Sequence, residues 1–132
     1  MKAALDLLRD LGVQPTPQRI AVARFVLRTG KHPTADEVLA HVRRTCPTAS
    51  RATVYNTLNL LAEKGLLRIQ VLRGGGAVYD ANTERHHHFI DERTGAIHDI
   101  PWDAVRVSGT ASLDGLEVLD YQVVMRGRKR RR

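Results

Sequence analysis

The pattern of apolar residues changes at Gly65, and this change restricts the folds open to the chain. Upstream of Gly65, apolar side chains recur every three or four residues, which is typical of amphipathic helices. Downstream, residues 66–72 and 77–80 read as two strands around the glycines at 74–76, which predicts a β-hairpin with a flexible tip. Several helices followed by such a hairpin is the order of a winged-helix DNA-binding domain, although other small domains share that order.

Capping signals define the helices of the first half. Thr16 followed by Pro17 is typical of a helix start, since proline is tolerated in the first turn. Thr34 and Glu37 have the spacing of a capping box, and Ser50 can cap the helix that follows it. The sequence therefore predicts four helices, at residues 2–11, from 17 to near 30, from 35 to near 46, and at 51–64.

The last of these helices is the candidate reader of DNA. Val54, Leu58 and Leu61 share one face of a helical wheel and are expected to pack inward. Asn56 lies roughly opposite, and an asparagine side chain can pair bidentately with adenine in the major groove. Leu60 also falls on the outward side, which the wheel does not explain. An ordinary amphipathic helix with a polar solvent face is the alternative.

Charge is distributed unevenly along the chain. Residues 1–79 contain twelve Lys/Arg and five Asp/Glu, a net +7, whereas residues 80–125 contain three and nine, a net −6. The last seven residues, RGRKRRR, add six positive charges. A basic first half favours a polyanion partner, nucleic acid first, over a merely soluble basic surface. The basic tail at 126–132 is expected to be disordered and able to touch phosphates without reading sequence.

Cys46 is the single cysteine of the chain. An intramolecular disulfide is therefore excluded, as is a zinc site made only of cysteines within one chain. One unpaired thiol suits a reducing compartment. The first residues lack the continuous apolar core of a signal peptide, and no apolar run approaches the length of a membrane span. We expect a cytoplasmic protein with no membrane partner.

Histidines concentrate in the second half, where four of the six fall between residues 86 and 98. If residues 86–91 form a strand, His86 and His88 lie on one side of it and His87 on the other. Two imidazoles placed two residues apart on a strand supply half of a metal site. A polar, solvent-exposed histidine cluster is the alternative.

Two aspartates are placed to complete that site. Asp80 ends the predicted hairpin, and Asp99 lies on the strand that a turn at 94–95 folds back onto the histidines. His98 and His87 face the other sides of their strands, so we expect neither of them to be a ligand. The pattern predicts a centre made of imidazole and carboxylate donors.

In these motifs the chain resembles the ferric uptake regulator family of bacterial metalloregulators. The resemblance covers nearly all of residues 2–100 and rests on six blocks in the family's order. They are GV at 12–13 with TPQR at 16–19, HPTAD at 32–36, ATVYNTL at 52–58, VYD at 78–80, HHH at 86–88 and GAIHD at 95–99. The chain looks most like the peroxide-sensing branch, because ferric-uptake members tend to carry Glu where Asp80 and Asp99 stand.

The resemblance implies an α+β fold in two parts. A winged-helix DNA-binding domain would span residues 1–79, a hinge 80–85, and a small α/β dimerisation and metal-sensing domain 86–125. It also implies a regulatory metal site of three histidines and two aspartates at the hinge. Such a donor set suits Fe²⁺ or Mn²⁺ and also accepts Zn²⁺ in vitro. The matching residues are His32, Asp80, His86, His88 and Asp99.

A regulator of this kind is a homodimeric repressor that binds a palindromic operator in double-stranded DNA and senses peroxide through bound Fe²⁺. Iron, manganese or haem sensing without a peroxide response is the alternative, since haem-sensing members also carry a histidine triplet and Cys46-Pro47 is compatible with haem. A metalloenzyme would need a substrate pocket and a general base, for which no constellation is visible. A metal-independent winged-helix protein is a third possibility. The candidate DNA contacts are Arg19, Arg51, Thr53, Tyr55 and Asn56.

The chain departs from the family in its metal-binding motifs. It has no paired CxxC motifs, so no structural zinc is expected. A further metal site of iron-type members is expected to be absent, because Arg85 and Arg106 stand at its positions and arginine cannot ligate. Apolar packing alone must then hold the dimer, with Leu113, Leu116, Val118, Val123 and Val124 as the candidates.

The second half is also shorter than usual in the family. Because the segment 101–118 contains Gly109 and Gly115, we expect only a brief helix within 101–107. A last strand is predicted at 119–125.

Overall fold

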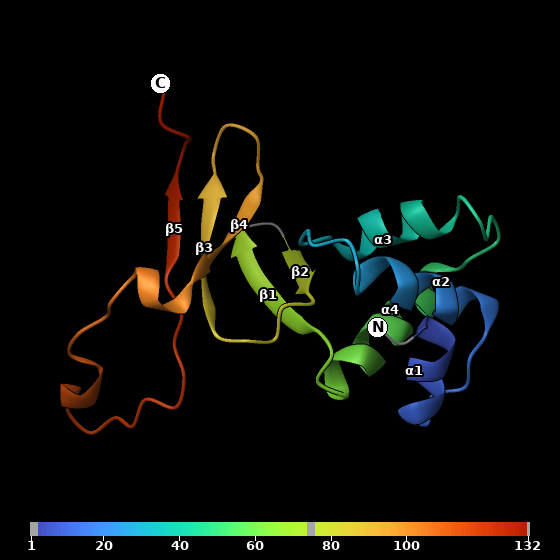
Figure 1. The fold of residues 1–132 in the computed structure, drawn as a ribbon, viewed down its shortest axis with the longest axis horizontal. Coiled ribbons are helices and arrows are strands. Elements are labelled where there is room, and N and C mark those ends of the chain that lie inside the picture. Colours follow the sequence, from blue (N-terminus) through green and yellow to red (C-terminus); the bar gives the residue numbers. More distant parts are fainter. Residues whose placement is uncertain (1–2, 74–75, 132) are drawn as a thin grey trace. The chain divides into compact units, whose positions relative to one another are not determined.

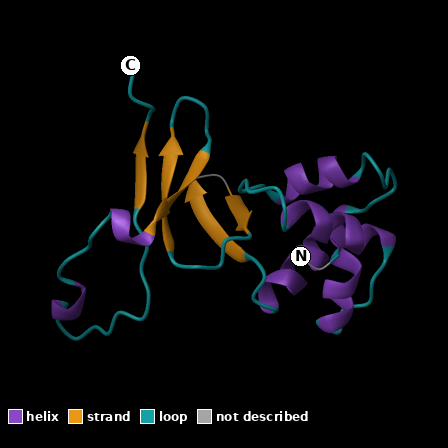
Figure 2. Cartoon of the chain, in the orientation of Figure 1, coloured by secondary structure: helices purple, strands orange, loops and turns teal. Residues whose placement is uncertain are grey.

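The computed structural model describes residues 3–73 and 76–131, and the chain divides into two compact units between Thr83 and Glu84. This boundary falls within the segment 80–85 that the sequence marks as a hinge. The first unit is mainly helical and the second is built on strands (Figure 2). Among the described residues, no helix is both long enough and apolar enough to cross a membrane.

In its described residues, the first unit has four helices followed by an antiparallel hairpin, as the sequence predicts (Figure 1). The predicted caps are present: Thr16 accepts a hydrogen bond from the backbone N–H of Arg19, and Ser50 accepts one from Thr53. The predicted hairpin turn includes glycines 74 and 75, which lie outside the described residues. The elements are α1 (Ala4–Asp10), α2 (Pro17–Val26), α3 (Ala35–Val42), α4 (Arg51–Glu63), β1 (Arg68–Arg73) and β2 (Gly76–Asp80).

The core of the first unit lies between the helices. Val54, Leu58 and Leu61 of α4 are fully buried in it, as the helical wheel predicts. Leu60, which the wheel leaves on the outer side, is half-buried and packs against the same core. The apolar contact surface of α4 is therefore wider than a single stripe, and Asn56 remains exposed beside it.

A backbone hydrogen bond joins the end of the hairpin to the segment before α3. Thr34 and Glu37 form the predicted capping box, which sets where α3 begins. The backbone N–H of Tyr79 in β2 donates to the carbonyl of Pro33, with an N···O distance of 2.9 Å. Burial raises the pKa of the Tyr79 hydroxyl. The residues next to this link are His32 and Asp80.

The second unit is a three-stranded sheet with the order β4-β3-β5. β3 pairs antiparallel with β4 and parallel with β5, which runs along its other edge (Figure 1). Two single turns of 3-10 helix occur in the long connection from β4 to β5. The elements are β3 (His86–Asp91), β4 (Ile97–Pro101), η1 (Trp102–Ala104), η2 (Thr110–Ser112) and β5 (Val124–Gly127).

Two sequence-based predictions for this unit need correction. The last strand was expected at 119–125 but spans Val124–Gly127, so Arg126 and Gly127 belong to the sheet and not to the tail. The cause is its parallel pairing with β3, which is distant in sequence and leaves no local signal at the strand ends. The helix expected within 101–107 is reduced to η1, and η2 was not anticipated.

Candidate metal centre and nucleic-acid interface

Three donor atoms converge on one face of the second unit's sheet. His86 Nε2 lies 3.0 Å from His88 Nε2, and Asp99 Oδ1 lies 3.6 Å and 3.7 Å from these two atoms. Strand alternation puts both histidines on the same side of β3, and the β3–β4 register sets Asp99 directly opposite His88. Both histidines are buried, whereas the Asp99 side chain is 34% exposed.

The hydrogen bonds of the two rings determine which nitrogen is available. His86 Nδ1 lies 2.5 Å from the carbonyl oxygen of Glu84, and a carbonyl can only accept, so the proton is on Nδ1. His88 Nδ1 lies 2.9 Å from Gln122 Oε1, which assigns its proton in the same way. In the neutral rings both Nε2 lone pairs therefore point at the space shared with Asp99. An outer partner on the far nitrogen is the usual arrangement of a metal-binding histidine.

His87 has the opposite arrangement. Its Nδ1 accepts a hydrogen bond from the backbone N–H of Val123 at 3.0 Å, and its Nε2 lies 3.2 Å from the carbonyl of Trp102, to which it donates. The ring also stacks on Trp102 with 4.5 Å between centroids. Both nitrogens are engaged in the neutral form, so His87 anchors β3 to its neighbours and has no lone pair to offer. His98 lies beside Phe89 on the other side of β4 from Asp99.

The first unit holds the other two predicted ligands close together. His32 Nε2 lies 3.4 Å from Asp80 Oδ2, and both side chains are about as buried as core residues. Asp80 Oδ1 also accepts the backbone N–H of Asn82 at 2.9 Å, which orients the carboxylate. A buried imidazole beside a buried carboxylate in an apolar domain is costly unless the pair is hydrogen-bonded or serves a cation.

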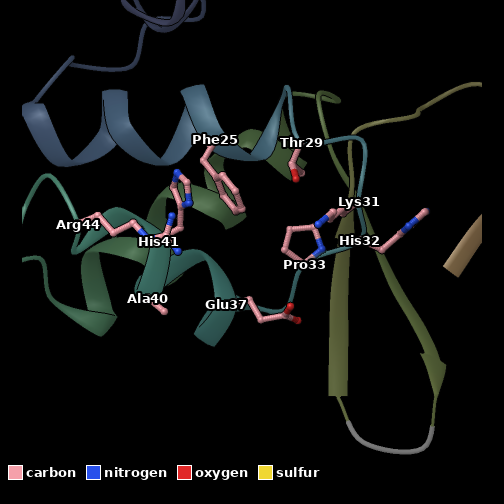
Figure 3. A pocket seen from close by; sticks show the side chains of 9 residues that line it. All are labelled: Phe25, Thr29, Lys31, His32, Pro33, Glu37, Ala40, His41 and Arg44. Atoms are coloured by element: carbon pink, nitrogen blue, oxygen red, sulfur yellow. The ribbon is translucent and has the colours of Figure 1, made fainter. Parts of the chain in front are cut away.

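A hollow of about 510 Å³ opens on the first unit next to His32. Figure 3 shows the Phe25 and His41 rings side by side in its lining, with His32 directed away from them. The Phe25 and His41 rings stack at 3.9 Å, so His41 is used in packing on the surface of α3. Cys46 is not among the lining residues; its Sγ lies 4.0 Å from the carbonyl of Pro17.

The donor set in the second unit fits a divalent transition metal. Atoms bound at about 2.1 Å stand about 3.0 Å apart in an octahedron and about 3.4 Å apart in a tetrahedron. The three observed separations of 3.0 to 3.7 Å lie close to that range. Two histidines and one carboxylate on one face of an ion, with other positions open, is the arrangement typical of non-haem Fe²⁺ sites.

The predicted DNA contacts lie on or next to the first unit's helices and differ in how they are held. Tyr55 and Asn56 are exposed on α4. Arg51 is exposed but forms an ion pair with Asp36, which raises the pKa of its guanidinium. Thr53 is half-buried and takes part in the Ser50 cap, whereas Arg19 donates to the carbonyl of Gln14 at 3.0 Å. Tyr55 and Asn56 are thus exposed and take no part in the Ser50 cap or the Asp36 ion pair, although Tyr55 interacts with Arg51.

Sequence reasoning missed the groups that support the predicted metal ligands. Gln122 contacts His88 from a distance of 34 residues along the chain, and no motif signals it. Arg85 was considered only as a lost ligand, yet its guanidinium lies 3.8 Å from the centroid of the Trp102 ring, on which His87 also stacks. The His87–Trp102–Arg85 group ties the start of β3 to η1, and cation–π contacts of this kind contribute on the order of 0.5–2 kcal/mol.

Comparison with known proteins identifies the family of the chain. The model of the ferric uptake regulator family matches residues 10–126. This chain belongs to the ferric uptake regulator family. Among its relatives, the regulator is 33% identical over 102 residues to the peroxide-responsive repressor PerR of Staphylococcus aureus, covering 77% of this chain and 69% of that protein.

Solved structures share the regulator's fold. A Campylobacter jejuni peroxide stress regulator is 26% identical and superimposes with a TM-score of 0.64, covering 99% of this chain and 98% of that one. A zinc-bound manganese uptake regulator is 24% identical with a TM-score of 0.72, covering 97% and 99%. The two units therefore have the α+β fold of these proteins.

Family membership sets the general activity. The regulator is a metal-responsive, DNA-binding transcription regulator and not an enzyme.

Proposed function

We propose that the regulator is a repressor that binds DNA when one Fe²⁺ or Mn²⁺ ion occupies a centre made by His32, Asp80, His86, His88 and Asp99, and that peroxide relieves repression through the Fe²⁺ form. The observation that carries the proposal is the triangle of His86 Nε2, His88 Nε2 and Asp99 Oδ1, with both imidazole lone pairs directed into it. Zn²⁺ is expected to enter the same site in vitro.

The division of the donors between two units explains how a metal would act as a signal. The second unit offers three donors and the first unit two, His32 and Asp80. Fe²⁺ and Mn²⁺ take five or six donors, so neither group alone saturates the ion. An ion held by both groups favours one arrangement of the units over others, and it shifts the population only by its extra affinity for that arrangement.

A preference for one arrangement would control DNA binding through the dimer. In a symmetric dimer, two copies of α4 must match two half-sites about one helical turn apart, so their separation has to be held. The second unit carries large apolar side chains on its surface, among them Leu113, Leu116 and Leu119, which are 49%, 69% and 87% exposed. Such side chains support a homodimer formed through this unit without structural zinc. A two-fold symmetric dimer implies a palindromic operator.

The peroxide response follows from the chemistry of this donor set. His86, His88 and Asp99 would hold an Fe²⁺ ion, which would supply the redox chemistry that activates hydrogen peroxide. One hydrogen peroxide and one ligand imidazole would together give one imidazole with an added oxygen and one water, so the ring would be the net two-electron reductant. His86 and His88 face the centre with their Nε2 atoms and are shielded from solvent, so a short-lived oxidant meets these rings first. An oxidised imidazole is a weaker donor, and the constraint between the units is released.

Two observations favour peroxide over simple metal sensing. The carboxylate opposite His88 is an aspartate, Asp99, as in the peroxide-sensing branch that the sequence resembles. The Staphylococcus aureus relative is named as peroxide-responsive and the Campylobacter jejuni structure as a peroxide stress regulator. Iron, manganese or haem sensing without peroxide is the competing function, since other structural relatives are a manganese uptake regulator and ferric uptake regulators.

The test compares two metals on one protein. The Fe²⁺-loaded and Mn²⁺-loaded regulators are treated with hydrogen peroxide, and DNA binding and peptide masses are measured on the same samples. We expect DNA release and a gain of one oxygen on a peptide with His32, His86 or His88 in the iron sample alone. Equal release with manganese, or oxidation confined to Cys46, would refute peroxide sensing and favour metal or haem sensing.

A further inference from the structure

One end of the second unit's sheet carries a concentration of positive charge that neither the metal donors nor α4 uses. Five basic side chains line a hollow of about 580 Å³ there. They are Arg93, Arg128, Lys129, Arg130 and Arg131, here called the cationic surface. All five residues are exposed.

The sheet itself places the tail beside Arg93. β5 runs parallel to β3, so the chain leaves the sheet at the end where the β3–β4 turn lies (Figure 1). The backbone N–H of Glu92 donates to the carbonyl of Gly127 at 2.8 Å, which fastens the end of β5 to that turn. A Cβ at Gly127 would lie 3.1 Å from Phe89 Cζ, so glycine permits this close approach. The first tail residues are thus anchored and do not start from a free chain end.

The turn that carries Arg93 is held by Asp91. Asp91 Oδ1 accepts the backbone N–H groups of Arg93 and Thr94 at 2.9 Å and 3.3 Å. The hydrogen bond from Arg93, with those from Thr94, lowers the pKa of the Asp91 carboxyl, so it remains charged in its backbone role. This carboxylate is occupied by the turn, and Glu92 is the other acidic residue at this end of the strand.

The rest of the second unit is acidic, so a cluster of five basic side chains is unusual in it. From residue 84 to 125 the chain has eight Asp/Glu and three Lys/Arg, one of which is Arg93. Like charges held together in one hollow repel each other, and a polyanion is the partner that removes this repulsion. Four of the five are arginines, whose planar guanidinium matches phosphate oxygens bidentately.

We propose that the cationic surface binds backbone phosphates of duplex DNA outside the bases read by α4. DNA is favoured over other polyanions because the regulator already holds DNA through its first unit, which raises the effective concentration of phosphates near the second. The hollow is lined by charged side chains alone among the described residues, whereas a membrane-binding surface would add apolar ones. The inference holds whichever metal or signal the regulator uses, so it does not rest on peroxide sensing.

The experiment measures how the affinity for DNA depends on salt. The Mn²⁺-loaded full chain is titrated with a duplex of random sequence between about 50 and about 200 mM salt, where each phosphate contact contributes about 0.9 to the slope of log K against log salt. One variant carries R93Q, R128Q, K129Q, R130Q and R131Q together. A second carries R93K, R128K, R130K and R131K, which keeps the charge. Arg93→Gln is compared with Arg106→Gln, another exposed arginine of the same unit.

We expect the neutralised variant to lose at least about 2 from the slope, the lysine variant to keep the slope, and Arg93→Gln to lose about 1 while Arg106→Gln loses none. Circular dichroism and Mn²⁺ affinity check that each variant is folded. An unchanged slope in the neutralised variant would overturn the proposal, as would equal losses for the Arg93 and Arg106 variants. If the slope falls in the neutralised variant but not in Arg93→Gln, the tail alone contacts phosphates, and the cationic surface as a joint site of Arg93 and the tail is refuted. Unchanged DNA binding with loss of binding to anionic phospholipid vesicles would identify a membrane as the partner instead.

Discussion

Gln122 fixes the proton of buried His88, a proposed metal ligand, and its replacement by leucine should weaken metal binding. The Gln122 Oε1 atom accepts from His88 Nδ1 at 2.9 Å, which leaves the His88 Nε2 lone pair facing His86 and Asp99. Leucine has a similar volume but accepts no hydrogen bond. In the metal-bound state of Gln122→Leu, His88 Nδ1 keeps its proton but has lost the oxygen that accepted its hydrogen bond.

The size of the effect follows from burial on the two sides of this bond. His88 is fully buried, and a buried donor that loses its partner costs about 1–3 kcal/mol, or roughly 5- to 150-fold in affinity. Without metal the cost is avoided, because the ring can move its proton to Nε2 and donate toward Asp99. Gln122 is exposed, so water can enter where its side chain was. We therefore expect a loss near the lower end, about tenfold, in agreement with the about 10- to 100-fold typical of outer partners of metal-binding histidines.

The assay is a Mn²⁺ titration in which electron paramagnetic resonance reports the free ion. Gln122→Glu is the matched variant, since it keeps an acceptor at the same position and should bind at least as tightly as the wild type. His41→Ala is the control for a change in Mn²⁺ affinity caused by removing a histidine that is not a proposed ligand. A Gln122→Leu protein that binds Mn²⁺ as tightly as the wild type would refute the assignment of the His88 proton. So would a Gln122→Glu protein as weak as Gln122→Leu, because the acceptor would then be irrelevant.

Four other predictions address the ligands, the reader helix, the dimer and the core. Replacing His86 or His88 by alanine should abolish tight Mn²⁺ binding in equilibrium dialysis, whereas His41→Ala should not; equal affinity in all three would remove the ligand assignment. Asn56→Ala should cost about 1–3 kcal/mol on an operator selected from random duplexes and relax its sequence preference, with little effect on random DNA. Equal losses on both DNAs would argue against α4 as the reader. The zinc-free protein should elute as a dimer at micromolar concentration, and a monomer, or stoichiometric zinc that chelators cannot remove, would contradict dimerisation by apolar packing. Leu58→Ala should lower the free energy of unfolding by about 2–5 kcal/mol in urea titrations, because Leu58 is fully buried in the core of the first unit; a change below about 1 kcal/mol would show that this core is loosely packed.

The helices of the first unit could be predicted from the sequence because their signals are local. Thr16, Thr34 and Ser50 cap helices through atoms within three residues, and each cap is present. The alternation of His86, His87 and His88 follows from the geometry of any strand, and the turn at 94–95 sets the partner of His88. For the same reason the triad of His86, His88 and Asp99 could be anticipated before its distances were known.

The rest depends on contacts between distant segments. The bounds of β5 are set by its parallel pairing with β3, and the alternating segment at 119–123, LDYQV, carries no sign that the sheet begins only at Val124. Gln122, Trp102 and Arg85 act through tertiary neighbours, so their roles appear only when β3, η1 and the approach to β5 come together. Leu60 stayed unexplained because a helical wheel assumes one buried stripe, whereas α4 also packs along a second side.

The most direct test of a metal ion shared by the two units separates metal binding from its effect on DNA. Wild type, His32→Ala and His41→Ala are titrated with Mn²⁺, and affinity for a selected operator is measured on the same samples. We predict that His32→Ala still takes up Mn²⁺ at His86, His88 and Asp99, with weakened affinity, but that Mn²⁺ no longer raises its affinity for the operator. His41→Ala should behave as the wild type in both measurements. Full Mn²⁺-dependent operator binding by His32→Ala would contradict the shared centre, because the second unit's donors would then be sufficient for regulation.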